Sequence, residues 1–119
     1  MIILCDDNRD HRTALRLALE QAQYSVREAA NGRAALDLQR QRSSPVLITD
    51  IFMPEADGFE LVDAVKREFP QTKVVMISGN KKSMVDYLAS ARMIGVDATF
   101  EKPFKVDALL KTIETLTRA

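Results

Sequence analysis

The sequence is short of cysteine, and it has no excess of charge of either sign. It contains a single cysteine, Cys5, which excludes an internal disulfide and a multi-cysteine metal site. Because Cys5 lies in an apolar run, we expect a buried thiol that packs as a small hydrophobic side chain. Lysine and arginine together number 17, as do aspartate and glutamate, so the net charge is about zero. Without a basic excess, direct binding to nucleic acid or to a membrane surface is not expected.

Long hydrophobic runs are absent as well. No apolar run approaches the ~20 residues that a membrane-spanning helix needs. The apolar start, residues 1–5, is too short for a signal peptide and is followed at once by two aspartates. We therefore expect a cytoplasmic protein. The 119 residues, of which 46% are hydrophobic and 29% charged, suffice for a single domain over residues 1–119 with one buried core.

What the sequence does contain is an alternation of short apolar runs with longer amphipathic stretches. The apolar runs predict strands at residues 2–5, 25–29, 46–49, 74–77 and 98–101. The stretches that follow them carry apolar residues at helical spacing, such as Leu61, Val65 and Phe69. They predict five helices, the fourth at residues 84–93 and the last at residues 106–116.

This order of elements predicts an α/β fold. Strands that are apolar throughout belong in a parallel sheet that is covered on both faces. Strands that alternate with helices give right-handed crossovers and a doubly wound sheet. We therefore predict a doubly wound, five-stranded parallel sheet with five helices, and the flavodoxin-like strand order 2-1-3-4-5 is one of the orders open to such a sheet.

Polar residues stand directly after most of the predicted strands. Those after the first, third, fourth and fifth strands are Asp6 and Asp7, Asp50, Ser78, and Lys102. In an open parallel sheet, ligands bind beyond the carboxyl ends of the strands, where the strand order reverses. If the order is 2-1-3-4-5, the first and third strands are neighbours, and the three carboxylates converge.

Converging carboxylates predict a cation site. Two like charges ~4 Å apart cost about 4 kcal/mol at an effective dielectric of 20, and this repulsion raises pKa values. A small oxygen-lined site that keeps several waters suits Mg²⁺ best. Lys102 adds a fixed positive charge on the far side. Cations that flank a carboxylate, with the Ser78 hydroxyl nearby, can hold a phosphoryl group.

Each of these residues also has an ordinary structural interpretation. Asp6 and Asp7 suit the capping position of a first helix. Lys102 is compatible with a solvated surface lysine, and Ser78 with a turn. Asp50 is harder to explain in this way, because it directly follows a strongly apolar run. The joint placement of the set at strand ends is what favours a functional site.

Four short motifs lie at the ends of the predicted strands. They are Asp6-Asp7, the run from Thr49 to Pro54 with Gly58, Ser78-Gly79, and Lys102-Pro103-Phe104. Each motif is weak alone, but in this order they resemble the receiver domains of two-component response regulators. The resemblance covers nearly the whole chain. It implies a chemotaxis-regulator-like fold with the flavodoxin-like strand order 2-1-3-4-5. It also implies phosphoryl transfer from a histidine kinase or a histidine phosphotransfer protein.

The resemblance further implies how a phosphoacceptor and a metal would be arranged. Asp50 would attack the phosphorus atom of a phosphohistidine and become an acyl phosphate. Mg²⁺ would be bound directly by Asp7, by Asp50 and by the backbone carbonyl of Phe52. Asp6 would act mainly through a metal-bound water.

The same resemblance implies roles for the residues around the phosphoryl group. Lys102 would pair with its oxygens, and the Ser78 hydroxyl would move to hydrogen-bond one of them. Gly79 would leave room beside the group and offer a backbone N–H. The peptide bond before Pro103 would be cis, a geometry open to X-Pro bonds, and would aim Lys102 into the site.

Some positions concern modulation of the signal. Phe52 and Asn80 occupy places that resemble those controlling how fast water removes the phosphoryl group. Receivers often carry an aromatic residue three positions before the lysine, but here Thr99 stands there and Phe100 takes the next, inward-facing slot. The usual switch is therefore not expected in its common form. The only histidine, His11, is interpreted as a helix-surface residue without a role.

The output and the partners are less determined. A receiver signals by phosphorylation-dependent protein binding or by relaying the phosphoryl group, as a monomer or as a phosphorylation-dependent homodimer. A stand-alone receiver and a piece of a larger regulator or hybrid kinase both remain open. A phosphatase with an aspartyl nucleophile is disfavoured, because such enzymes usually place a second acid where Phe52 stands. We expect a signalling domain rather than an enzyme, and the alternative is a phosphorylation-independent pseudo-receiver that serves as an interaction module.

Overall fold

The computed structural model describes residues 1–50, 58–78 and 95–118 of the chain. Its strands are β1 (Ile2–Cys5), β2 (Val26–Ala29), β3 (Val46–Asp50), β4 (Lys73–Ser78) and β5 (Ala98–Glu101). All of the expected strands are therefore present. The third and fourth end one residue later than their apolar runs, so that Asp50 and Ser78 are the last residues of their strands.

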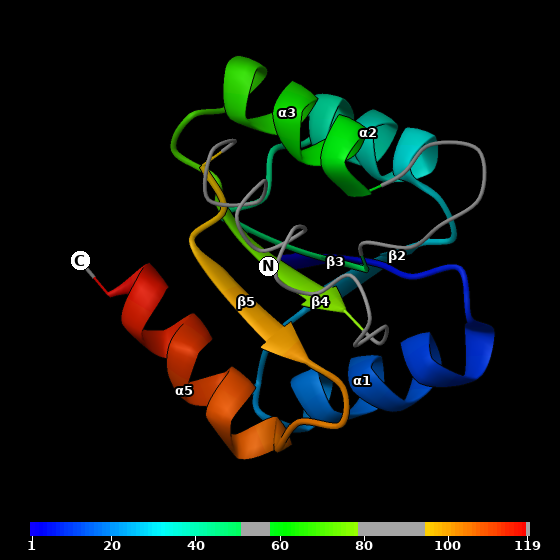
Figure 1. Cartoon of the computed structure of the whole chain (residues 1–119), viewed down its shortest axis with the longest axis vertical. Coiled ribbons are helices and arrows are strands. Elements are labelled where there is room, and N and C mark those ends of the chain that lie inside the picture. Colours follow the sequence, from blue (N-terminus) through cyan, green and yellow to red (C-terminus); the bar gives the residue numbers. More distant parts are fainter. Residues whose placement is uncertain (51–57, 79–94, 119) are drawn as a thin grey trace.

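The strands form one parallel sheet in the order β2-β1-β3-β4-β5 (Figure 1). The predicted flavodoxin-like order is confirmed. Neighbouring strands are in close register, so that Leu4 lies beside Ile48 and Ile48 beside Val75. Because the chain goes from β1 to one side of the sheet and then crosses to β3 on the other, the strand order reverses between β1 and β3. In open α/β sheets, ligands bind where the strand order reverses, at the carboxyl ends of the strands.

Helices cover both faces of the sheet. The pair α1 (Arg9–Gln21) and α5 (Val106–Thr117) packs on one face, and α2 (Gly32–Gln41) and α3 (Gly58–Glu68) pack on the other (Figure 1). The doubly wound arrangement is thus confirmed in the described part of the chain. The helix predicted at residues 84–93 lies outside the described residues.

Successive strand residues face alternate layers of helices, and this explains the unbroken apolar runs. In β1, Ile2 and Leu4 pack with the α1 and α5 layer, whereas Ile3 and Cys5 pack with the α2 and α3 layer. Every residue of β1 and β3 is buried. Each fully buried Leu or Ile side chain contributes roughly 1.5–3 kcal/mol, so these two strands anchor the fold beneath the sheet edge that carries the site.

Asparagine residues start the first two helices. The Asn8 side chain accepts a hydrogen bond from the backbone N–H of His11 at 3.0 Å, and Asn31 accepts one from that of Ala34 at 2.8 Å. These bonds satisfy backbone donors that a helix start leaves without an intrahelical partner. The first cap follows immediately after Asp6 and Asp7, and it fixes where the chain turns away from the sheet edge.

The opposite, amino end of the sheet is joined by buried polar side chains. The Gln39 amide donates to Thr72 Oγ1 at 2.8 Å and accepts from the Ser44 backbone N–H at 3.0 Å. The Thr72 hydroxyl donates to the Ser44 carbonyl at 2.9 Å, and all three residues are buried. This network ties the end of α2 to the loops that lead into β3 and β4.

Within the described residues, no helix has the length and apolar character that crossing a membrane requires. The cytoplasmic location stays a prediction.

Candidate functional site

The register of the sheet brings the polar strand ends to one edge. Cys5 pairs with Thr49, so Asp6 leaves β1 level with Asp50, the last residue of β3. Asp50 in turn lies beside Ile77, one residue before Ser78. The convergence that the sequence predicts is therefore a direct result of parallel pairing.

Three carboxylates meet at this edge. One oxygen from each of Asp6, Asp7 and Asp50 lies within 4.8 Å of the other two. Asp6 is 7% exposed and Asp50 is 9% exposed, whereas Asp7 is open to solvent. The cluster thus has a buried floor and one solvent-facing member.

Burial is the main cause that raises the pKa of the Asp6 carboxyl above its ordinary value. The negative charges of Asp50 and Asp7 raise it further, while the hydrogen bond from the Asn8 backbone and the charge of Lys102 lower it. The Asn8 N–H donates to Asp6 Oδ1 at 2.9 Å. A positive charge placed among the three carboxylates would stabilise their ionised forms.

Lys102 reaches the cluster from the loop after β5. Its Nζ lies 3.2 Å from Asp50 Oδ2 and 3.9 Å from Asp6 Oδ2. The backbone N–H of Lys102 donates to the Ser78 carbonyl at 2.7 Å, which holds the start of this loop against the end of β4. The peptide bond between Lys102 and Pro103 is cis, as the resemblance implied.

Ser78 offers a hydroxyl at the same edge. The residue is only 2% exposed, and its Oγ has no hydrogen-bond partner among the residues that the structure describes. A buried hydroxyl without a partner is costly, because the desolvation of its polar group is not compensated. It is therefore a donor available to a ligand that enters the site.

The donor set fits a hard divalent cation. All three candidate ligands are carboxylates, and oxygen is the ligand atom that Mg²⁺ prefers. The nearby thiol is a poor competitor, because burial raises the pKa of Cys5 to about 12 and keeps it protonated at neutral pH. This agrees with the expectation of a buried thiol that packs as a small apolar group.

The remaining positions of the predicted site divide into two groups. Thr99 is exposed on β5, and its neighbour Phe100 is half-buried with its ring centroid 5.6 Å from that of Phe104. The inward placement of Phe100 is confirmed, while a switching role for Thr99 stays a prediction. The other group, which lies outside the described residues, is Phe52, Gly79 and Asn80.

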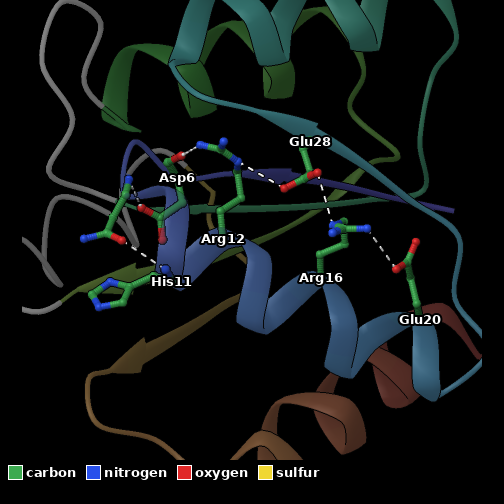
Figure 2. Close-up of polar contacts among 7 residues, drawn as sticks. Asp6, His11, Arg12, Arg16, Glu20 and Glu28 are labelled. Carbon is green, nitrogen blue, oxygen red and sulfur yellow. Dashed lines mark hydrogen bonds and ion pairs between the residues drawn. The ribbon is translucent and has the colours of Figure 1, made fainter.

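Two features beside the site were not predicted. The His11 imidazole is exposed on α1 as expected, but its Nδ1 lies 3.4 Å from Lys102 Nζ. The Arg12 guanidinium donates to the Asp6 carbonyl at 2.7 Å and to Glu28 Oε1 at 3.1 Å (Figure 2). The only signal in the sequence was that both residues stand within the first turn of a helix that begins at the carboxylate pair.

Comparison with known proteins gives a consistent result. The family model described as "Response regulator receiver domain" matches residues 2–114. The receiver domain of NtrX from Brucella abortus is 30% identical, with a TM-score of 0.89 over 98% of this chain and 97% of that one. The chemotaxis protein CheY4 of Vibrio cholerae is 29% identical, with a TM-score of 0.88 over 97% of this chain and 96% of that one.

A curated relative is the transcriptional regulatory protein SrrA of Staphylococcus aureus. It is 28% identical over 119 residues, which cover 98% of this chain and 47% of the relative. The chain therefore spans about half the length of the curated relatives that it matches.

Proposed function

Because this chain belongs to the response regulator receiver domain family, we propose that it accepts a phosphoryl group on Asp50 in a Mg²⁺-dependent reaction. The single observation that carries the proposal is the position of the Asp50 carboxylate. It belongs to the three-carboxylate cluster and at the same time lies 3.2 Å from Lys102 Nζ. A nucleophile between a cation site and a fixed ammonium group is suited to attack a phosphoryl group, whose oxygens carry negative charge.

The proposed reaction is a displacement at phosphorus. An Asp50 oxygen attacks the phosphorus atom of a phosphohistidine on the donor protein. The P–O bond to Asp50 forms as the P–N bond to the imidazole breaks, and the departing nitrogen keeps the electron pair. The product is an acyl phosphate on Asp50. Proper positioning supplies much of the rate in such transfers, because the protein takes little part in the covalent chemistry.

Lys102 and Ser78 would serve the transferred group. Lys102 Nζ, already beside Asp50, would pair with a phosphoryl oxygen and balance its charge. The buried Ser78 hydroxyl would gain the hydrogen-bond partner that it lacks among the described residues. Formation of that bond is a direct way for phosphorylation to change the end of β4.

Asp7, Asp50 and the backbone carbonyl of Phe52, a residue outside the described ranges, would hold Mg²⁺ directly, and Asp6 would hold it through a water. The bound cation would supply positive charge that offsets both the carboxylate repulsion and the charge of the incoming phosphoryl group. Gly79, Asn80, Pro103 and Thr99 keep the supporting roles implied by the resemblance, as part of this proposal.

The proposed phosphodonor is a histidine kinase or a histidine phosphotransfer protein. An open cleft of about 480 Å³ reaches Lys102 and Asp6 from the side of α1 and the loop before α5, with Pro103 and Val106 in its wall. Val106, the first residue of α5, lies in the wall of this cleft and is 37% exposed, so it offers a donor protein an apolar contact there. Leu17 on α1 is 55% exposed. We propose that a partner protein or a second copy reads the phosphorylated state.

The test is phosphorylation by a small donor. The protein is incubated with acetyl phosphate and Mg²⁺, and intact mass is measured for one added phosphoryl group. The proposal expects a gain that requires Mg²⁺ and is absent from the Asp50→Asn variant. If neither acetyl phosphate nor a histidine phosphodonor modifies a protein that binds Mg²⁺, the phosphorylation-independent interaction module becomes the better account.

A further inference from the structure

Arg12 lies in the first turn of α1 and contacts the backbone of the loop that carries Asp6 and Asp7. Its Nη1 donates to the backbone carbonyl of Asp6 at 2.7 Å (Figure 2). The contact is with the main chain of the residue, so the Asp6 carboxylate stays directed into the cluster with Asp7 and Asp50. The Arg12 side chain is only 16% exposed, which favours a fixed geometry over a mobile surface contact.

Glu28 on β2 holds the guanidinium in place. Arg12 Nε lies 3.1 Å from Glu28 Oε1, and Arg16 Nε lies 3.2 Å from Glu28 Oε2. Glu28 therefore sits between two arginines that are one helical turn apart, as Figure 2 shows. A planar guanidinium with several donors in fixed directions can bind the carbonyl and the carboxylate at once, which a lysine cannot do in the same way.

The hydrogen bond from Arg12 acts on the position of the Asp6 main chain. The positive charge of Arg12 is matched by Glu28, whereas its hydrogen bond fixes the Asp6 backbone. The Asp6 backbone N–H is held as well, by the Ala29 carbonyl at 3.1 Å. The N–H of Asp6 is thus bound to β2 directly, and its carbonyl is bound to β2 through Arg12 and Glu28.

We propose that Arg12, held by Glu28, is a positioning residue that fixes the Asp6 backbone and thereby sets the affinity of the carboxylate cluster for a divalent cation. The inference rests on the proposed function, since it assumes that the cluster binds Mg²⁺. Groups that orient metal ligands from outside the coordination shell typically change metal affinity by 10–100-fold when they are removed. Arg12 would be such a group, and it would contact neither the metal nor the phosphoryl group.

The experiment is a calorimetric titration of the full chain with Mg²⁺ in the absence of any phosphodonor. Arg12→Ala is expected to weaken Mg²⁺ binding by about tenfold. Glu28→Gln is expected to weaken it less. In the Arg12→Ala background the Glu28→Gln change should add nothing further, because Glu28 acts through the arginine.

The matched control is Arg40→Ala. Arg40 binds Glu68 through two nitrogens, at 2.9 and 2.6 Å, on the surface formed by α2 and α3. Its loss removes an Arg–Glu ion pair that is more exposed than the Arg12–Glu28 pair and lies at the carboxyl ends of α2 and α3, away from the strand ends that carry the carboxylates. Mg²⁺ affinity should therefore be unchanged. Urea unfolding without metal verifies that each variant is folded at the temperature of the titration.

The outcomes separate this inference from the proposed function. If the unmodified chain binds Mg²⁺ and Arg12→Ala binds it within about twofold, the positioning role is wrong and the phosphoacceptor proposal stands. A loss in Arg40→Ala equal to that in Arg12→Ala also overturns the inference, because it would reflect general stability. If the unmodified chain does not bind Mg²⁺, the metal part of the proposed function fails together with this inference.

Discussion

Asp6, Asp7 and Asp50 carry the same carboxylate in three different surroundings. Asp6 is buried and accepts a hydrogen bond from the Asn8 backbone, Asp7 faces solvent, and Asp50 is buried beside Lys102. These surroundings favour different tasks. The exposed carboxylate is open to a hydrated cation, and the one beside the ammonium group suits the nucleophile of the proposed function. The buried Asp6 carries a cost of being charged, because burial raises its pKa.

The Asp6→Asn substitution tests that cost. Because burial raises the pKa of Asp6, its ionised form lowers the stability of the metal-free folded state at neutral pH. The neutral amide keeps an oxygen for the Asn8 N–H, so we expect a gain of about 1 kcal/mol in the free energy of unfolding, the order of one like-charge contact at 4 Å in water. Mg²⁺ binding should weaken in the same variant.

Urea unfolding at several pH values measures the effect. The penalty on the unmodified protein should shrink as the pH falls through the raised pKa of Asp6. It should vanish below the ordinary value of 3.8, where Asp6 is protonated in both folded and unfolded states. A variant that is less stable than the unmodified protein at pH 7 would mean that the attraction of Lys102 outweighs burial.

At the scale of elements, helix starts determine how the strand-end loops are held. Both α1 and α2 begin at an asparagine that follows a strand by only a few residues. The first of these caps, at Asn8, also donates its backbone N–H to Asp6 Oδ1. The second, at Asn31, follows the edge strand β2 and contacts none of the three carboxylates through the hydrogen bonds described here. The two caps therefore make the same kind of helix-capping bond, but only the one at Asn8 also contacts a carboxylate of the site.

Replacing each cap by alanine should separate stability from metal binding. Loss of the side-chain bond is expected to lower the free energy of unfolding by about 1 kcal/mol for both Asn8→Ala and Asn31→Ala. Only Asn8→Ala should also weaken Mg²⁺ binding, because its cap ends the loop that carries Asp6 and Asp7. Chemical unfolding and metal titration of both variants provide the comparison. Equal metal affinities in the two variants would show that the α1 cap has no influence on the loop.

At the scale of the whole molecule, the two ends of the sheet differ in how well their buried polar groups are paired. The carboxyl end gathers like charges and the Ser78 hydroxyl, which has no hydrogen-bond partner in the described part of the chain. Both features lower stability in the absence of a ligand. The amino end gathers buried polar groups that satisfy one another, in the network of Gln39, Ser44 and Thr72. The buried polar groups at the end opposite the site therefore stabilise the fold, whereas those at the site do so only when a ligand is bound.

The Thr72→Val substitution tests this division. It leaves the buried Gln39 amide without its 2.8 Å acceptor, so the free energy of unfolding should fall by about 1–3 kcal/mol. Phosphorylation of Asp50 by acetyl phosphate should be unchanged. The control is Thr115→Val on the exposed side of α5, where the change is expected to stay within about 0.5 kcal/mol. A loss of phosphorylation in folded Thr72→Val would contradict the separation of the two ends.

The strand-and-helix order and the residues at the strand ends could be predicted from the sequence, because both depend on local patterns. An unbroken apolar run marks a strand buried on both faces, and the register of parallel pairing then brings Asp6, Asp50 and Ser78 to one edge. The β2-β1-β3-β4-β5 order did not follow from these patterns alone. It was implied by the resemblance of the strand-end motifs to receiver domains, and the convergence of the carboxylates follows from it.

The contacts that hold the site were decided only by the tertiary structure. Arg12 and Glu28 are 16 residues apart, His11 and Lys102 are 91 apart, and Gln39 and Thr72 are 33 apart. No periodicity relates such positions, because their side chains meet only after helices pack on the sheet at particular distances and angles. The sequence by itself determined which residues could do the chemistry. The packing of α1 against β1 and β2 decided how the Asp6 main chain is held, because it brings Arg12 to both Asp6 and Glu28.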